Sequence, residues 1–166
     1  MKQLLAAISL YLIFGSFVAF AGKMDKYHVW FAQFDGTTKY KRCWIYSEPI
    51  KAKGDYKRRG KIYALVTHLP RENVFDQVQF IAGYNFRKDS DVKVKIGRNE
   101  FKLFTVGDAA WLGKAEDDTR LVKAMRAGSE MVVSGVSSRG TETIDKYSLK
   151  GFTAAYKKIT KKCQKK

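Results

Sequence analysis

The chain has little of the residue types that build metal and thiol sites. Among its 166 residues there are two cysteines, Cys43 and Cys163, and two histidines, His28 and His68. A zinc site needs three or four such ligands at short spacing, so the sequence predicts no metal site. It also predicts no cofactor, because it contains neither a phosphate-binding loop nor a dinucleotide fingerprint. We interpret His68, just before Pro70, as a loop histidine that hydrogen-bonds to backbone.

Catalytic motifs are also lacking. The segment 135–140 (GVSSRG) matches the G-x-S-x-G pattern of hydrolases only in part, because its spacing is wrong. We interpret it as a hairpin loop. We therefore predict no catalytic residues and a protein that is not an enzyme. A hydrolase of envelope polymers stays as a less favoured alternative, which would need a cleft lined by titratable groups with perturbed pKa values.

Long hydrophobic runs are absent after Phe20, and only two prolines interrupt the chain. Before that point, Lys2 precedes an uncharged apolar run over residues 4–20, and Ala19 to Ala21 has the small-x-small form of a cleavage site. This pattern predicts a cleaved Sec signal peptide over residues 1–21 and one domain over residues 22–166. A retained anchor is the alternative, although the run is at the short limit for a membrane span. The predicted location is the periplasm or the medium, with outer-membrane association as a further option.

Acidic residues are scarce relative to basic ones. The chain has 32 Lys and Arg against 16 Asp and Glu, which gives a net charge of +16. Such a field attracts polyanions and speeds encounter with them. Outside the cytoplasm these would be lipopolysaccharide, anionic lipid or acidic glycan, so export argues against cytoplasmic nucleic acid as the partner. Another envelope protein is the alternative partner, reached through an exposed strand edge.

What the sequence does contain is mostly strand signal. Alternating or aromatic-rich segments predict strands at residues 27–34, 38–46, 61–67, 78–86, 130–135 and 143–150, with a possible short strand within 50–60. Residues 91–104 predict a β-hairpin, because Val92, Val94 and Ile96 alternate with lysines before a Gly97-Arg98-Asn99 turn.

Two helices are expected. Asp117 or Asp118 would cap the first, with Gly128 just past its end. The second would run from about Phe152 to Cys163, because its apolar residues recur on one stripe. The strands and helices together predict a mainly β, single-domain fold: a β-sandwich or a partly open barrel with two short helices.

The even number of cysteines suggests a disulfide in an exported protein, and two cysteines allow one intramolecular pairing. That bond would join Cys43, in an early strand, to Cys163 in the last helix. It would close a loop worth roughly 4 to 5 kcal/mol at most in the chain-entropy account. Two unpaired buried thiols are the alternative.

Basic and aromatic residues near Cys43 form the candidate binding site. If Cys43 points inward, strand alternation places Arg42, Trp44 and Tyr46 on the opposite face. The alternative is that this face is a second core layer with Trp44 buried. A dense basic loop follows the strand. Its candidate anion- or partner-binding residues are Lys57, Arg58, Arg59 and Lys61.

Several separate blocks of the sequence carry a family resemblance: CWIYSEP (43–49), VTHLP (66–70), AGYNF (82–86), FKLFTVGDAAW (101–111), and SSRGT and YSLKGFTAAYKKI within 131–163. Together, and in this order, they resemble the invasion-associated locus B family of exported alphaproteobacterial proteins. The resemblance covers nearly the whole mature chain. It implies an exported β-rich domain with a Cys43–Cys163 bond and an association with host-cell invasion. It carries no catalytic residues over to this chain.

Overall fold

The computed structural model describes residues 24–36 and 41–163, so the expected signal peptide lies outside the described residues. The described chain is mainly β, as predicted, and has two α-helices, α1 (Ala115–Ala127) and α2 (Phe152–Cys163). The strands are β1 (Asp25–Tyr27), β2 (Trp30–Asp35), β3 (Arg42–Ser47), β4 (Lys51–Gly54), β5 (Tyr63–Leu69), β6 (Val74–Ile81), β7 (Val92–Ile96), β8 (Asn99–Val106), β9 (Ala109–Trp111), β10 (Glu130–Val136) and β11 (Glu142–Ser148). A short 3₁₀ helix, η1 (Pro70–Glu72), links β5 to β6.

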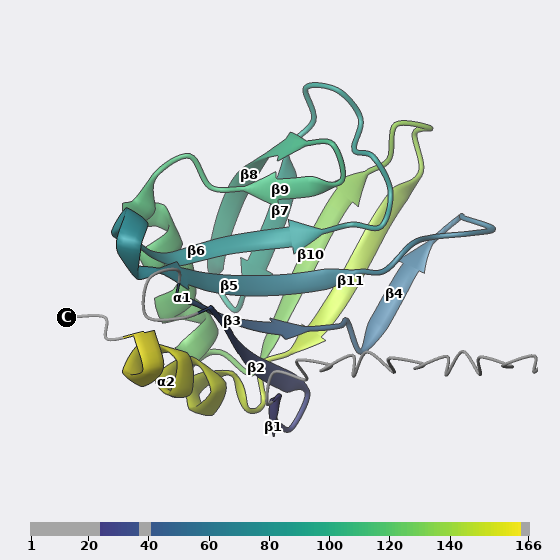
Figure 1. Ribbon diagram of the computed structural model, residues 1–166. Coiled ribbons are helices and arrows are strands. Elements are labelled where there is room, and N and C mark those ends of the chain that lie inside the picture. Colours follow the sequence, from purple (N-terminus) through teal and green to yellow (C-terminus); the bar gives the residue numbers. More distant parts are fainter. Residues whose placement is uncertain (1–23, 37–40, 164–166) are drawn as a thin grey trace, which may run out of the picture.

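The strands form one open antiparallel sheet. Its order is β1-β2-β3-β5-β6-β9-β8-β7-β10-β11-β4, so the consecutive strands β3 and β4 lie far apart in the sheet order. Figure 1 shows how the sheet curls: β3, β5 and β6 cross in front of β7, β10 and β11. The core lies between these two halves, where the rings of Phe80 and Tyr147 are 6.3 Å apart. Of the two arrangements expected, the continuous sheet is closer to the partly open barrel.

The β7–β8 hairpin follows the sequence pattern. Val92, Val94 and Ile96 are buried, whereas Lys93 and Lys95 are exposed. Gly97 in the turn has a φ of +57°, a conformation that glycine adopts without a Cβ clash. The hairpin therefore has one core face and one basic, hydrated face, as predicted.

Three details of the predicted strands are different in the structure. The segment 27–34 is not one strand, because the chain turns at His28, with a φ of +55°, and pairs β1 with β2. Strand β6 covers residues 74–81, earlier than expected, and the short strand β9 was not predicted. Local aromatic content does not reveal where a strand turns back on itself, since both arms of a hairpin share that composition.

Helix α1 begins before the aspartates that were expected to cap it. Its N-cap is Lys114, and no side chain caps it. Asp118 instead is buried in the first turns, where its Oδ1 accepts a hydrogen bond from the Val78 backbone N–H at 2.8 Å. The carboxylate thus ties α1 to β6 rather than to its own helix end, a tertiary role that a local capping rule does not reveal. Gly128 follows the helix, as predicted.

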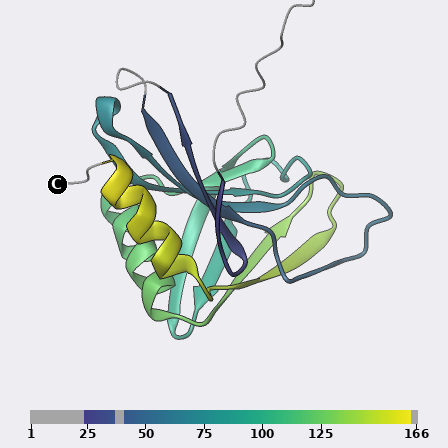
Figure 2. The ribbon, with the colours of Figure 1, turned by 60° about the horizontal axis from the view of Figure 1, so that its bottom comes forward.

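Helix α2 has the predicted bounds, and its expected apolar stripe is buried. It packs on β1, β2 and β3, and Lys158 pairs with Asp25 at 3.0 Å. The predicted disulfide is present between Cys43 and Cys163, both buried, with a Cα–Cα distance of 6.1 Å. Figure 2 shows α1 and α2 side by side at one end of the curled sheet. The turns at the opposite end are left uncovered by helices.

His68 lies in β5 rather than in a loop, because the strand continues to Leu69. Its side chain is fully buried. The Asp76 backbone N–H donates to its Nδ1 at 3.1 Å, so the predicted bonding to backbone is confirmed. The Tyr156 hydroxyl donates to the Asp76 carboxylate at 2.7 Å, which links this polar cluster to α2. In the described part of the chain no helix is long and apolar enough to cross a membrane.

Candidate functional site

An open pocket of about 900 Å³ lies at the end of the sheet away from the helices. Three segments far apart in the sequence line it: the loop between β4 and β5, the segment after β6, and the β10–β11 turn. Its lining residues lie at 55–60, 83–85, 137–139, 141 and 143. Such a volume is typical of small-molecule sites. The pocket depends on how these three loops are held together.

Arg59 holds the first loop in place. Its side chain is only 4% exposed and makes two hydrogen bonds to the Asp145 carboxylate of β11, at 2.7 and 2.6 Å. Its Nε donates to the Ala82 carbonyl at 2.7 Å. Burial disfavours the charged guanidinium, but the hydrogen bond and charge of Asp145 raise the pKa of Arg59 above its ordinary value. A buried two-pronged ion pair of this kind fixes geometry as well as charge.

Backbone hydrogen bonds join the three segments. The Gly60 N–H donates to the Gly83 carbonyl at 2.9 Å, and the Ser138 N–H donates to the Asn85 carbonyl at 2.8 Å. Gly83 has a φ of +72°, and a Cβ there would lie 2.5 Å from the Gly60 oxygen. Only glycine permits this approach. The base of the pocket is therefore formed before any ligand arrives.

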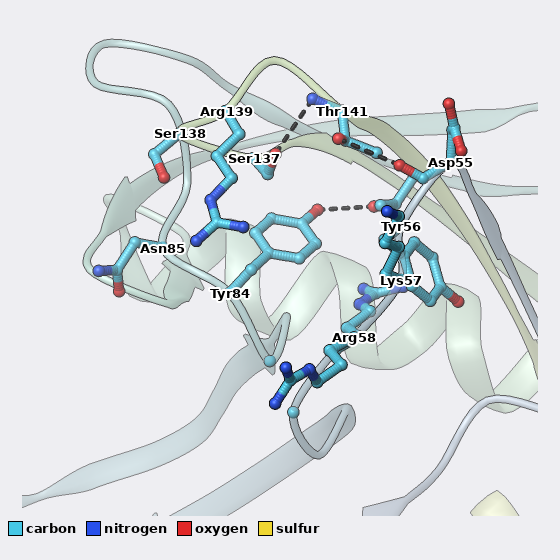
Figure 3. A pocket seen from close by; sticks show the side chains of 14 residues that line it. Asp55, Tyr56, Lys57, Arg58, Tyr84, Asn85, Ser137, Ser138, Arg139 and Thr141 are labelled. Carbon is cyan, nitrogen blue, oxygen red and sulfur yellow. Dashed lines mark hydrogen bonds between the residues drawn. The ribbon is translucent and has the colours of Figure 1, made fainter.

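Tyr84 stands at the centre of the pocket (Figure 3). Its hydroxyl shares a 2.6 Å hydrogen bond with the Thr143 hydroxyl. The Arg59 guanidinium lies 4.9 Å from its ring centroid and 5.5 Å from that of Tyr56. Burial raises the pKa of Tyr84, so its phenol stays neutral at physiological pH. The two tyrosines and Arg59 form a stacked, aromatic wall.

Three further cations line the pocket: Lys57, Arg58 and Arg139. All three are exposed, and none has a carboxylate partner within 4 Å among residues 24–36 and 41–163. In Figure 3 the side chains of Arg139 and Arg58 lie on opposite sides of Tyr84. Among the residues that the structure describes, Asp55 is the one carboxylate that lines this pocket. The net charge of the lining is therefore positive, which favours an anionic ligand.

The polar residues of the lining are hydrogen-bonding groups rather than metal ligands. Asn85, Ser138 and Thr141 supply amide and hydroxyl groups. No group of three or more His, Cys, Asp or Glu side chains that could hold a metal ion occurs in the described residues. The arrangement can thus position an anion by charge and a polar ligand by hydrogen bonds.

The residues of the predicted basic loop have different roles in the structure. Lys57 and Arg58 line the pocket as exposed cations. Arg59 also lines it, but its charge is taken up by Asp145, so it does not offer the free cation that the sequence suggested. Lys61 lies outside the lining. Its side chain is 78% exposed and its Nζ is 4.0 Å from Glu48.

The predicted residues of β3 lie elsewhere. Arg42, Trp44 and Tyr46 are on the face opposite Cys43, as strand alternation predicted, and none of them lines the pocket. Arg42 pairs with Asp35 at 2.8 Å, and Tyr46 stacks on another aromatic ring, 5.2 Å away. Trp44 is partly exposed beneath Arg42, so this face is not a fully buried second core layer.

Sequence reasoning missed Tyr84, Asn85 and Arg139 as site residues. They lie in the AGYNF and SSRGT blocks, which were noted only for their resemblance to a family. The segment 135–140 was expected to be a hairpin loop, and residues 137–141 do join β10 to β11, although residues 135 and 136 still belong to β10. Pairing β10 with β11 brings that loop to the same end as the β6 turn, where Ser138 meets Asn85. This proximity depends on the sheet order, which no local pattern encodes.

The fold and pocket define a single-sheet β protein with a basic, preformed site at its open end. The sequence model described as "Invasion associated locus B (IalB) protein" matches residues 30–160, so the chain belongs to the invasion-associated locus B family. This is an exported, envelope-associated family that is not known for enzymatic activity.

A solved structure shares the fold. The crystal structure of invasion associated protein B from Bartonella henselae superposes with a TM-score of 0.60 and 12% sequence identity. The match covers 86% of this chain and 97% of that one. Among curated proteins, none matches the sequence. At this identity the likeness supports the fold, whereas the family match supports an invasion-associated protein.

Proposed function

We propose that this is an exported, non-enzymatic protein of the periplasm or the medium that binds an anionic envelope or host component. Its binding site is the basic pocket. One observation carries the proposal: Lys57, Arg58 and Arg139 surround a preformed pocket without a carboxylate partner in the described residues. The family match to invasion associated locus B proteins supports the part of the proposal that places this binding in host-cell invasion.

Fixed loops favour such a role. The Arg59–Asp145 pair and the Gly60–Gly83 and Ser138–Asn85 hydrogen bonds order the loops in advance. A ligand then loses less of its binding free energy to loop ordering. The three exposed cations add long-range attraction, which raises the rate of encounter with anions and weakens with salt.

A second role is favoured by the open edge of the sheet. Strand β4 is the last in the sheet order, and all four of its residues are exposed. Such an edge can accept an extended segment of a partner protein. Lys51 and Lys53 lie on that strand, and edge lysines disfavour indiscriminate pairing. A partner in envelope assembly is therefore the alternative function.

The test measures binding of residues 22–166 to lipopolysaccharide and to anionic lipid vesicles in low salt. Lys57→Glu with Arg58→Glu should weaken binding at least about tenfold, because both cations line the pocket. The matched control is Lys93→Glu with Lys150→Glu. It makes the same change in net charge at exposed positions outside the pocket lining.

The control variant should lose no more than about threefold, through the weakened overall field. An equal loss in the two variants would show that net charge alone drives binding and would contradict the pocket. Recovery of one envelope protein by crosslinking, insensitive to salt and abolished by Lys53→Pro, would favour the assembly role instead.

A further inference from the structure

We infer that the ligand of the basic pocket is an acidic oligosaccharide, bearing sulfate, phosphate or carboxylate groups, rather than a membrane surface. The inference rests on the proposed function, since it names the ligand class of the same site. It follows from the shape of the site, its neutral polar groups and its aromatic wall.

The apolar residues exposed on the molecule lie outside the pocket. Among the described residues, the large hydrophobic side chains that are at least half or nearly half exposed are Met24, Ile50, Phe104, Val106 and Ile144. None of them lines the pocket. Peripheral membrane binding combines cations with apolar side chains that enter the acyl boundary. Here Lys57, Arg58 and Arg139 line a concavity that a flat bilayer cannot fill, which favours a ligand small enough to enter.

Neutral hydrogen-bonding side chains lie among the cations. Asn85 and Ser138 are exposed at the pocket, and their backbones are joined by the 2.8 Å hydrogen bond. Thr141 lies beside them, where its N–H donates to the Ser137 hydroxyl at 3.1 Å. A purely electrostatic anion site would need no such groups. Sugars present many hydroxyls, and amide and hydroxyl side chains can both donate to them and accept from them.

The aromatic wall suits the ring of a sugar. Tyr56 and Tyr84 are each partly exposed, and Arg59 is stacked near both rings. A tyrosine offers an apolar face beside a polar edge, which matches a sugar ring with C–H groups on one face and hydroxyls at its rim. Arg58 and Arg139 carry planar guanidinium forks that can bind carboxylate, sulfate or phosphate groups in a two-pronged manner.

The test is titration calorimetry of residues 22–166 in low salt with four probes. These are a heparin-derived sulfated tetrasaccharide, an uncharged tetrasaccharide of the same length such as chitotetraose, a delipidated phosphorylated lipopolysaccharide core oligosaccharide, and phosphatidylglycerol–phosphatidylcholine vesicles. At least one acidic oligosaccharide should bind at least about tenfold more tightly than the neutral one. Preference for the sulfated probe would indicate host glycans, and preference for the phosphorylated core would indicate envelope sugars.

Two variants separate sugar recognition from charge. Arg139→Ala should weaken acidic oligosaccharide binding about tenfold, whereas Lys93→Ala should change it less than about twofold. Asn85→Ala with Ser138→Ala leaves the charge and the backbone hydrogen bond in place, and should weaken binding about three- to tenfold. Unchanged affinity in that neutral variant would overturn the assignment to a saccharide.

The outcomes for the two proposals differ. Binding to vesicles that depends on Lys57 and Arg58, with no binding of either acidic oligosaccharide, would overturn the saccharide and leave the anion-binding function standing. Absence of binding to every probe would overturn both.

Discussion

Two basic regions of this protein look alike in the sequence and are different in the structure. On the β7–β8 hairpin, Lys95 pairs with Glu100 at 3.1 Å and Lys102 pairs with Asp91 at 2.8 Å. Around the pocket, Lys57, Arg58 and Arg139 have no carboxylate partner in the described residues. Lys93 and Arg98 of the hairpin are likewise without a carboxylate partner in the described residues, so neither net charge nor lack of pairing alone locates a site. The pocket differs because its three cations surround a concavity with a polar and aromatic lining.

Strand register explains the Lys95–Glu100 pair on the hairpin. Lys95 is directly opposite Glu100 across the β7–β8 pair, where opposite charges attract. The pocket cations come from two loops brought together by the sheet order, and the buried carboxylate of Asp145 is already bound by Arg59. One arginine of the basic loop is thus a structural residue, and its neighbours are left for ligands.

The largest expected effect comes from removing the Arg59–Asp145 ion pair, which holds the first pocket loop in place. Arg59→Ala leaves Asp145 buried and without its partner, so the free energy of unfolding should fall by about 3 to 5 kcal/mol. Urea unfolding of residues 22–166 measures it. Lys61→Ala, in the same loop but exposed, should cost less than about 1 kcal/mol. An equally small cost for Arg59→Ala would show that the pair does not hold the loop.

A second experiment separates stability from anion binding through pH. Burial, with the charges of Asp76 and Asp117, raises the pKa of Asp118 to about 6, against the opposing effect of the Val78 N–H. The protonated form is favoured in the folded state. The contribution of protonated Asp118 to the free energy of unfolding is therefore complete below pH 3.8, the ordinary pKa of an aspartate. It is lost as pH rises through 6.

Asp118→Asn removes this titration and keeps an oxygen for the Val78 N–H. Relative to the wild type, the variant should gain up to about 3 kcal/mol between pH 4 and pH 7, measured by urea unfolding at each pH. Binding of acidic oligosaccharide should be the same in both proteins at pH 7, because lysine and arginine stay charged. A difference in stability that is constant with pH would contradict the assignment to Asp118.

The smallest effect is expected on the hairpin. Lys95→Ala and Lys102→Ala each remove one exposed ion pair, and each should cost at most about 1 kcal/mol. Thermal unfolding gives the cost, and calorimetry should find the affinity for acidic oligosaccharide within about twofold of the wild type. A loss of affinity as large as that of Arg139→Ala would remove the distinction between the two regions.

Much of the fold could be predicted from the sequence, because it is encoded locally. The hairpin at residues 92–106 shows its alternation, α2 shows its apolar stripe, and two cysteines in an exported protein allow one internal bond. Asp118 was misread as a cap, because its partner is the Val78 N–H on a distant strand. Tertiary partners of this kind override local signals.

Only some of the residues of the basic pocket could be predicted from the sequence. Lys57 and Arg58 were found because they are adjacent in the chain, while Arg139 and Tyr84 were missed as site residues because sheet order alone brings them there. The same limit hid the role of Arg59, whose partner Asp145 is 86 residues away. Composition indicated an anionic partner, and the structure shows that Lys57, Arg58 and Arg139 line one pocket.

The most direct test of this account is a backbone amide NMR titration of residues 22–166 with the acidic oligosaccharide in low salt. The account predicts that shift changes concentrate at residues 55–60, 83–85 and 137–141, and that the hairpin at 92–103 stays unchanged. Shift changes spread over exposed lysines in proportion to their number, with the hairpin affected as strongly as the pocket, would contradict it.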